Sequence, residues 1–205
     1  YDAGGEHISS DGTIVNPGTG VLIMNHFASM QAGRSGISLE TGGLGHAVLG
    51  WADDREMSGF FDIYSQRIDQ DCNTLYSQPD EGGKIVSSIG SADLLTRHPR
   101  ITYMNESTTV MVWEDYRNDD GSNSDVYLQL LDTDGDGILA ENGIAISTAA
   151  NSQYLPRIKA DNNYVYVVWE DLRNHPIYSD IYAQKVGLDG TIYWDADGLA
   201  ISTEI

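Results

Sequence analysis

Short segments of apolar and alternating residues follow one another along the chain, and their periods are those of β-strands. Residues 164–169 are β-branched, aromatic or apolar throughout, which is typical of a strand covered on both faces. Residues 180–186 alternate polar and apolar positions, and turn-forming residues such as 161–163 separate these segments. No segment carries an apolar repeat of helical period, so the pattern predicts an all-β protein.

The strand pattern itself repeats. The motif W-x-D-x-R occurs three times, and D-[IV]-Y-x-Q begins seven or eight residues after each arginine. The tryptophans are 62 and 56 residues apart. The repeated positions are Trp51, Asp53, Arg55 and Asp62, then Trp113, Asp115, Arg117 and Asp125, then Trp169, Asp171, Arg173 and Asp180. Downstream, G-[IL]-A-I-S-T occurs at residues 143–148 and 198–203, with a looser copy at 83–87.

Each repeat has room for four short strands, and four-stranded units of this period are typical of β-propeller blades. The sequence therefore predicts a β-propeller-like array of four-stranded antiparallel blades. We expect residues 1–30 to be the end of a preceding repeat and residues 31–92, 93–151 and 152–205 to be three full repeats. Because propellers have about 4–8 blades, we expect further blades or another chain to complete the ring.

The pattern W-E-D-x-R-N … S-D-I-Y-A-Q-K … G-x-A-I-S-T resembles a family of secreted bacterial repeat proteins. It is also similar, more distantly, to TolB-like propeller blades, in which an arginine loop precedes a D-I-Y strand. The first copy departs from the pattern, because Ala52 stands where the other copies have glutamate. The resemblance implies a propeller-like fold and a secreted or cell-surface setting, but no defined activity.

The tryptophan and arginine of each motif have two interpretations. They form a ligand platform of an aromatic face and a fork of donors, or they serve the repeated unit itself, which we favour because the residues recur in every copy. In the second interpretation, the tryptophan packs between blades and the arginine pairs with the aspartate that opens the next strand. The expected pairs are Arg55 with Asp62, Arg117 with Asp125, and Arg173 with Asp180.

The charge, the apolar runs and the cysteine content of the chain limit what it can bind and how it can be cross-linked. The 205 residues carry 11 Lys and Arg against 31 Asp and Glu, a formal charge of −20. This excess of negative charge argues against nucleic acid and anionic membranes, which clustered cations bind. The longest apolar run near the N-terminus is far too short to cross a bilayer. A single cysteine, Cys72, excludes an internal disulfide.

One acidic segment suggests a cation. Residues 132–137 (D-T-D-G-D-G) place Asp132, Asp134 and Asp136 at alternate positions, like the first half of a calcium loop. The position of that loop's closing glutamate holds Gly143. Calcium therefore stays one interpretation, and an ordinary hairpin turn is the one we favour.

The chain lacks G-x-S-x-G, H-E-x-x-H and the phosphate-binding G-x-x-x-x-G-K-[ST]. We expect an extracellular module for binding or assembly with no catalysis of its own. Its expected partners are other copies of itself or further blades of a longer chain, because a blade left at the end of a stack has an uncovered apolar face. Two alternatives are a glycan-binding propeller lectin and a fragment of a propeller hydrolase.

Overall fold

The computed structural model contains three similar β-sheets and one small strand pair. It describes residues 3–5, 21–24, 37–42, 45–53, 61–76, 82–89, 96–118 and 123–203. All regular structure in these ranges is β, so the predicted all-β class and its four-stranded antiparallel units are confirmed. In this described part of the chain, no helix has the length and hydropathy that crossing a membrane requires.

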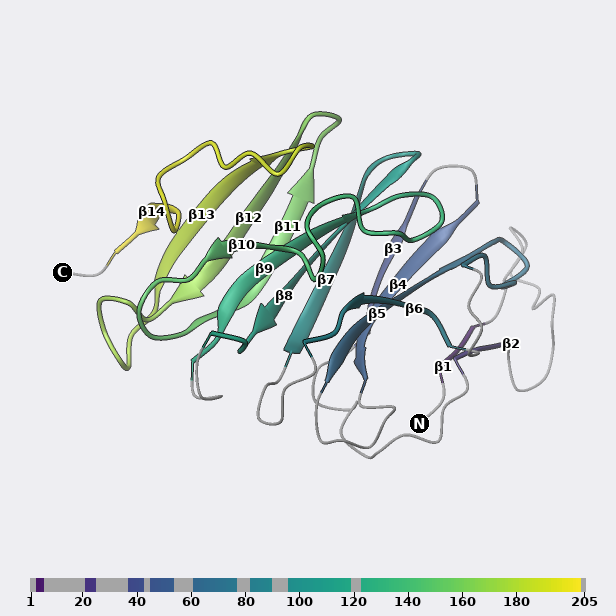
Figure 1. Cartoon of the computed structure of the whole chain (residues 1–205), viewed down its shortest axis with the longest axis horizontal. Helices are drawn as coiled ribbons and strands as arrows, with labels where there is room; N and C mark the ends of the chain where they lie inside the picture. Colours follow the sequence, from purple (N-terminus) through teal and green to yellow (C-terminus); the bar gives the residue numbers. More distant parts are fainter. Residues whose placement is uncertain are drawn as a thin grey trace, which may run out of the picture.

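Each four-stranded sheet is an antiparallel meander of one continuous chain segment (Figure 1). The small pair consists of β1 (Ala3–Gly5) and β2 (Val21–Met24). Sheet 1 consists of β3 (Ser38–Thr41), β4 (Ala47–Asp53), β5 (Asp62–Ile68) and β6 (Lys84–Ser87). Sheet 2 consists of β7 (Thr96–Asn105), β8 (Thr108–Asp115), β9 (Asp125–Leu131) and β10 (Ile144–Ser147). Sheet 3 consists of β11 (Gln153–Ala160), β12 (Tyr164–Asp171), β13 (Asp180–Gly187) and β14 (Leu199–Ser202).

The strand registers of the three sheets coincide. Each motif tryptophan pairs with the tyrosine of the following D-[IV]-Y-x-Q strand, as Trp113 does with Tyr127. The same pairing occurs in the other sheets, between Trp51 and Tyr64 and between Trp169 and Tyr182. The first strands of sheets 2 and 3 are also interrupted at the same place, by shifts of register between Arg97 and Arg100 and between Tyr154 and Arg157. The repeat in sequence is therefore a repeat in structure.

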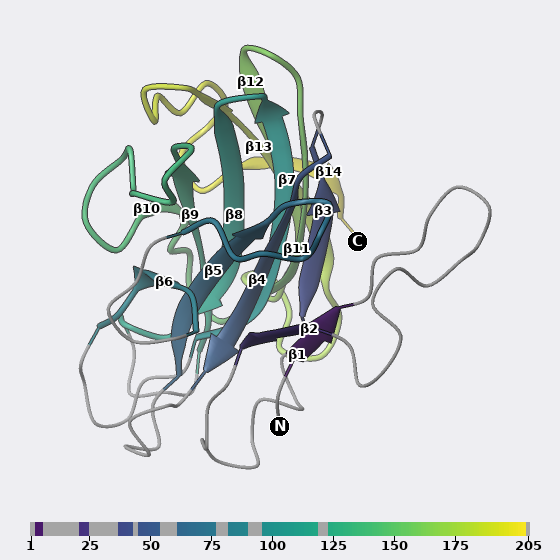
Figure 2. The same cartoon turned by 90° about the vertical axis from the view of Figure 1, so that its right-hand side faces the viewer.

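The sheets stack face on face, with sheet 3 at the left of Figure 1 and sheet 1 towards the right. Figure 2 looks along the stack from the sheet 1 end, where the sheets lie one behind the other. We call the face of a sheet towards the preceding sheet its N-side face and the other its C-side face. Strand alternation sends successive side chains of β8 to opposite faces. Met111 and Trp113 therefore face sheet 1, while Val110 and Val112 face sheet 3.

Two apolar cores fill the spaces between sheets. Between sheets 1 and 2, Trp113 packs with Val48, Ala52 and Ile63. Met111 packs closely on Gly50 there, since a Cβ on Gly50 would lie 2.4 Å from Met111 Cε and the methionine would have to shift. Between sheets 2 and 3, the core joins the C-side face of sheet 2 to the N-side face of sheet 3, including Val112, Leu128, Ile146, Val165, Val167 and Trp169. Trp113 and Trp169 thus pack between sheets, as expected for a structural motif, whereas Trp51 packs with Leu49, Tyr64 and Ile68 of its own sheet.

Candidate functional site

Each motif tryptophan donates a hydrogen bond to the aspartate two residues later. Trp113 Nε1 lies 2.8 Å from Asp115 Oδ2, and the aspartate is fully buried. Trp169 and Asp171 repeat this bond at 2.8 Å. The bond between Trp51 and Asp53 in sheet 1 is longer, at 3.4 Å. A buried carboxylate needs such donors, because burial without them is costly.

The motif arginine pairs with that same aspartate, so the prediction that Arg117 pairs with Asp125 is wrong. Arg117 Nη2 lies 2.6 Å from Asp115 Oδ2, and Arg117 Nε lies 2.9 Å from Asp115 Oδ1. The backbone N–H of Arg117 also donates to Asp115 Oδ1, so the loop turns back over this carboxylate and brings the side chain with it. Asp125 accepts a hydrogen bond from Asn118 instead, at 2.8 Å.

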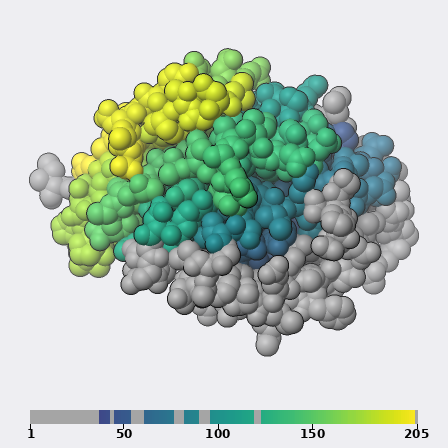
Figure 3. All heavy atoms as spheres, in the orientation of Figure 1, coloured from purple at the N-terminus to yellow at the C-terminus, as the bar shows by residue number. Residues whose placement is uncertain are grey.

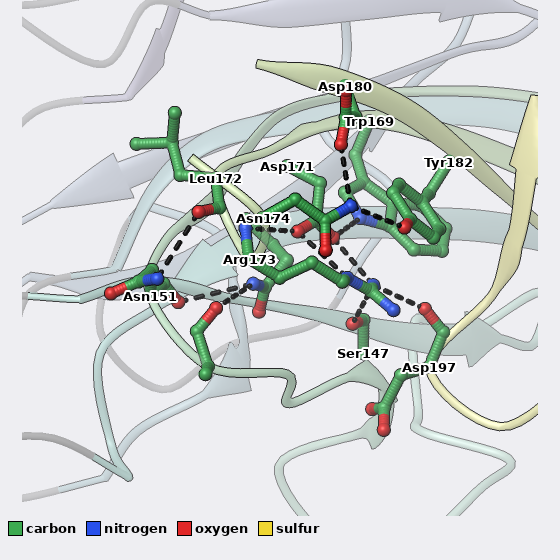
Figure 4. A network of polar contacts seen from close by, with 12 residues as sticks. Ser147, Asn151, Trp169, Asp171, Leu172, Arg173, Asn174, Asp180, Tyr182 and Asp197 are labelled. Atoms are coloured by element: carbon green, nitrogen blue, oxygen red, sulfur yellow. Dashed lines mark hydrogen bonds and ion pairs between the residues drawn. The ribbon is translucent and has the colours of Figure 1, made fainter. Parts of the chain in front are cut away.

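Sheet 3 repeats this arrangement, so the predicted pair of Arg173 with Asp180 is also wrong. Arg173 Nη2 lies 2.6 Å from Asp171 Oδ2, while Asn174 donates to Asp180 at 2.7 Å (Figure 4). Burial alone would lower the pKa of Arg173, but the hydrogen bonds and charge of Asp171 raise it, so the guanidinium stays charged. Its Cζ lies 3.8 Å from the centre of the Tyr182 ring, a cation–π contact. Arg55 lies outside the described residues.

The same arginines reach the preceding sheet, a contact that the sequence did not reveal. Arg117 Nη2 donates to Ser87 Oγ on β6 at 3.2 Å, and Arg173 Nη2 donates to Ser147 Oγ on β10 at 3.3 Å. One residue further on, the backbone N–H of Thr148 donates to Asp197 Oδ1 at 2.8 Å. Sheets 1 and 2 share the equivalent bond, from the N–H of Ser88 to Asn142 Oδ1. The motif arginine thus links its own sheet to the preceding one, and we call the arginine with its aspartate and serine partners the clamp.

A glutamate adds a second link between sheets 2 and 3. Glu114 lies on the C-side face of β8, is only 2% exposed and accepts a hydrogen bond from the backbone N–H of Leu155 at 2.7 Å. Its Oε1 also lies 2.9 Å from His98 Nδ1. Leu155 and His98 stand in the two register shifts and have positive φ angles of 52° and 51°. The irregular first strand of sheet 3 therefore points the N–H of Leu155 at a carboxylate of sheet 2, whereas the irregularity in β7 places the imidazole of His98 beside the same carboxylate.

The acidic segment of residues 132–137 forms a hairpin turn held by sheet 1. Asp132 Oδ1 accepts hydrogen bonds from the backbone N–H groups of Asp134 and Asp136. Lys84 of sheet 1 lies 2.5 Å from Asp136 Oδ1 and also donates to the carbonyl of Asp134. Among the described residues, no three acidic, histidine or cysteine side chains are grouped as metal ligands. Calcium binding at this turn stays a prediction.

Cys72 stands in the corresponding turn of sheet 1, with a positive φ of 63°. Its thiol is buried and free. Burial raises the pKa of Cys72, and the charges of Asp69 and Asp71 raise it further. A thiol with a raised pKa is a poor nucleophile, because the thiolate is the reactive form. The cysteine is therefore no candidate for covalent catalysis.

The C-side face of sheet 3 is exposed, in contrast to the buried C-side face of sheet 2. We call it the open face: Val168, Glu170, Ile181, Leu199, Ile201 and Ser202. Three of its apolar side chains are well exposed, namely Val168 (40%), Leu199 (39%) and Ile201 (57%). A hollow of about 190 Å³ lies in it, lined in part by Leu155, Val168, Glu170 and Ile181. Sheet 3 forms the surface at the left end of Figure 3.

An aromatic cluster continues the open face beyond Val168. Lys185 Nζ lies 3.5 Å from the ring centre of Tyr164 and 5.3 Å from that of Tyr193. Tyr164 and Tyr193 meet edge to face, and Tyr166 contacts the indole of Trp194. Tyr193 is 51% exposed. Exposed aromatic faces beside a cation can stack on a flat apolar surface and offer a donor at its edge.

No protein-family model and no curated protein matches this chain. Among solved structures, it is similar to a glycosyl hydrolase from Bacteroides ovatus, at 13% identity and a TM-score of 0.46 over 78% of this chain and 50% of that one. It is also similar to an endo-arabinase from Bacteroides thetaiotaomicron, at 13% identity and a TM-score of 0.43 over 79% of this chain and 56% of that one. The chain spans about half the length of these two structures.

Proposed function

We propose that the chain is part of a β-propeller-like array of blades that serves binding or assembly in an extracellular setting, with no catalysis of its own. The arrangement of the sheets supports the propeller. The first strands of neighbouring sheets contact each other, β3 with β7 and β7 with β11. The last strands β6, β10 and β14 have extensive contacts only with a strand of their own sheet. Sheets that converge at their first strands and diverge at their last strands radiate as blades do.

The open face of sheet 3 is the observation that carries the assembly role. Its apolar residues Val168, Leu199 and Ile201 are exposed, although the corresponding Val112 and Ile146 of sheet 2 are buried, and Ile144 is partly buried, against sheet 3. Exposed apolar patches rimmed by polar groups mark interaction sites. The motif residues Asp115 and Arg117 are bonded within the fold and to the neighbouring sheet, which supports a structural role over a ligand-binding one.

Polysaccharide binding is the second candidate, and the aromatic cluster around Lys185 favours it. Tyr164, Tyr166 and Tyr193 present rings close to the Lys185 cation, at one end of the inner strands β12 and β13 of sheet 3. Sugar rings have apolar faces that stack on such side chains, while their hydroxyl groups take hydrogen bonds from charged groups.

One experiment separates these functions from that of a hydrolase. The purified chain is passed over immobilised neutral and acidic polysaccharides, and each polymer is then sized after long incubation with the protein. Retention that Tyr193→Ala removes, with polymer length unchanged, would support polysaccharide binding. Oligomers in light scattering without retention would support assembly alone. Shortening of any polymer would overturn the proposal and support the hydrolase.

A further inference from the structure

We infer that the open face of sheet 3 is the docking surface for a further four-stranded sheet that carries the W-x-D-x-R motif and an acidic turn after its third strand. This inference rests on the proposed assembly function and names its partner. The open face is the equivalent, one repeat further on, of the C-side face of sheet 2, which is already covered by sheet 3.

The interface between sheets 2 and 3 supplies a template with four parts. Glu114 accepts the N–H of Leu155 in the incoming first strand, and Ser147 accepts the incoming arginine. The N–H of Thr148 donates to the incoming Asp197. Apolar residues of the C-side face, Ile146 among them, bury the incoming tryptophan.

The open face repeats each part at the equivalent position of sheet 3. Glu170 precedes Asp171 as Glu114 precedes Asp115, and its Oε2 accepts a bond only from its neighbour Ser179 among the contacts of the described residues. Ser202 follows Ile201 as Ser147 follows Ile146, and Thr203 comes next; both are exposed. The sheet thus presents an acceptor for a backbone N–H, an acceptor for an arginine and a donor for a carboxylate or amide.

The hollow in the open face lies at the position that, on sheet 2, is filled by the backbone of the next sheet's first strand near Leu155. Its lining includes Val168, Glu170 and Ile181. The equivalent residues Val112, Glu114 and Val126 are fully covered in sheet 2, where the register shift at Leu155 is seated against Glu114. A strand with the same irregularity would fill the hollow and satisfy the carboxylate of Glu170.

The acidic turn of the partner follows from Lys185. The residue after each motif glutamine is Arg67 in sheet 1, Leu130 in sheet 2 and Lys185 in sheet 3. Arg67 donates to the carbonyl of Thr133 in the acidic turn of sheet 2, next to the Lys84–Asp136 pair. In sheet 2 this position holds the buried Leu130, on the face that packs against sheet 3. The equivalent turn of sheet 3, residues 188–191, has a single acidic residue. A lysine at this position therefore favours a partner of the sheet 2 type.

The partner's turn also has a steric requirement. Gly135, with φ +80°, lies so close to Tyr76 of sheet 1 that a Cβ would be 2.7 Å from the ring. Trp194 takes the position of Tyr76, because the backbone N–H of each donates to the motif glutamine of its own sheet. A glycine in the incoming turn would let it lie on this indole.

Sheet 1 of a second copy fits the open face less well than a sheet of the sheet 2 type. On its N-side face, Trp51 and Tyr64 are already covered, at 3% and 2% exposed, while Leu39 is 58% exposed. Its turn holds Cys72 where sheet 2 has Gly135, so it lacks the glycine that lets the turn lie on the ring beneath it. The partner is therefore an additional sheet of the sheet 2 type.

The test extends the chain with a second copy of residues 93–151, which form sheet 2 and carry every feature named above. In the extension, the first strand would begin six residues after Thr203, whereas β11 begins at Gln153, five residues after Thr148. We expect one cooperative melting transition at a higher temperature than in the parent chain, because neighbouring repeats stabilise one another. Hydrogen exchange at the backbone amides of Thr203 and residues 199–202 should slow at least tenfold, because local opening of β14 would then also have to break its contacts with the added sheet.

Glu170→Gln tests the specific contact. In the extended chain it should make exchange at the added first strand about tenfold faster, because a charge-assisted bond to a backbone N–H is weakened. In the parent chain the same change should leave the melting temperature nearly unchanged. Glu106→Gln, in the exposed turn between β7 and β8, is the matched control and should have no effect in either chain.

Two results would overturn the docking inference. One is an added sheet that folds while residues 199–203 exchange as fast as in the parent chain. The other is an added sheet that stays unfolded, because a single repeat cannot bury its own apolar face and folds only when a neighbour covers it. Either result leaves the outcome of the polysaccharide and light-scattering experiment untouched, so the two proposals fail separately.

Discussion

The C-side faces of sheets 2 and 3 share several residues at equivalent positions and have opposite environments. Val112 and Ile146 in sheet 2 are 0% and 3% exposed, whereas the equivalent Val168 and Ile201 in sheet 3 are 40% and 57% exposed. Glu114 binds a backbone N–H of the next sheet, whereas Glu170 binds a side chain of its own sheet. The pattern of a repeat therefore states which residues can be buried, and the neighbouring sheet decides whether they are.

The N-side faces of sheets 2 and 3 are both buried, and replacing the tryptophan on either face should give the largest loss of stability. Trp113 and Trp169 are both buried against a preceding sheet, so Trp113→Ala and Trp169→Ala should each lower the free energy of unfolding by about 3–5 kcal/mol. Urea denaturation monitored by circular dichroism measures both. Val168→Ala is the control and should cost less than about 0.5 kcal/mol. A cost for Trp169→Ala as small as that of the control would mean that sheet 3 is not packed on sheet 2.

The clamp should likewise be equally strong in the two sheets. Arg117→Ala and Arg173→Ala each remove the partner of a fully buried aspartate, so each should cost about 2–4 kcal/mol. Lys159→Ala removes an exposed cation of sheet 3 and should change stability little. Asp125→Asn, combined with Arg117→Ala, separates the observed pairing from the one predicted from sequence: only if Arg117→Ala costs nothing more in the Asp125→Asn background would Asp125 be restored as the arginine's partner.

The glutamates should differ, which tests the comparison most directly. Glu114→Gln should cost about 1–2 kcal/mol, because the buried N–H of Leu155 loses its charged acceptor. Glu170→Gln should cost less than about 0.5 kcal/mol, because its bond to Ser179 is partly exposed. Equal costs in thermal or urea unfolding would show that sheet 3 already buries its glutamate in solution, by association of the open face.

The acidic turn should give the smallest effect. Asp132 already accepts two backbone bonds and Asp136 pairs with Lys84, so we expect calcium chloride and sodium chloride of equal ionic strength to raise the melting temperature equally, by screening the charge of −20. A larger rise with calcium that Asp134→Ala abolishes would establish the calcium site predicted from Asp132, Asp134 and Asp136.

The sequence alone determined the all-β class, the four-stranded unit and the buried position of Trp51, Trp113 and Trp169. These follow from alternation and recurrence, which a single strand carries in its own residues. The same local signals place turn chemistry at Asp132 and Asp189, whose carboxylates accept backbone N–H groups two residues later.

Only the tertiary structure decided what each motif residue contacts. The choice of Arg117 between Asp115 and Asp125 depended on how the loop folds back, and its bond to Ser87 joins residues 30 positions apart on different sheets. The lysine that holds the acidic turn comes from 50 positions upstream. Charge and spacing within one repeat carry no record of these neighbours, because burial and pairing between sheets are set by packing, which brings together segments that are distant in the chain.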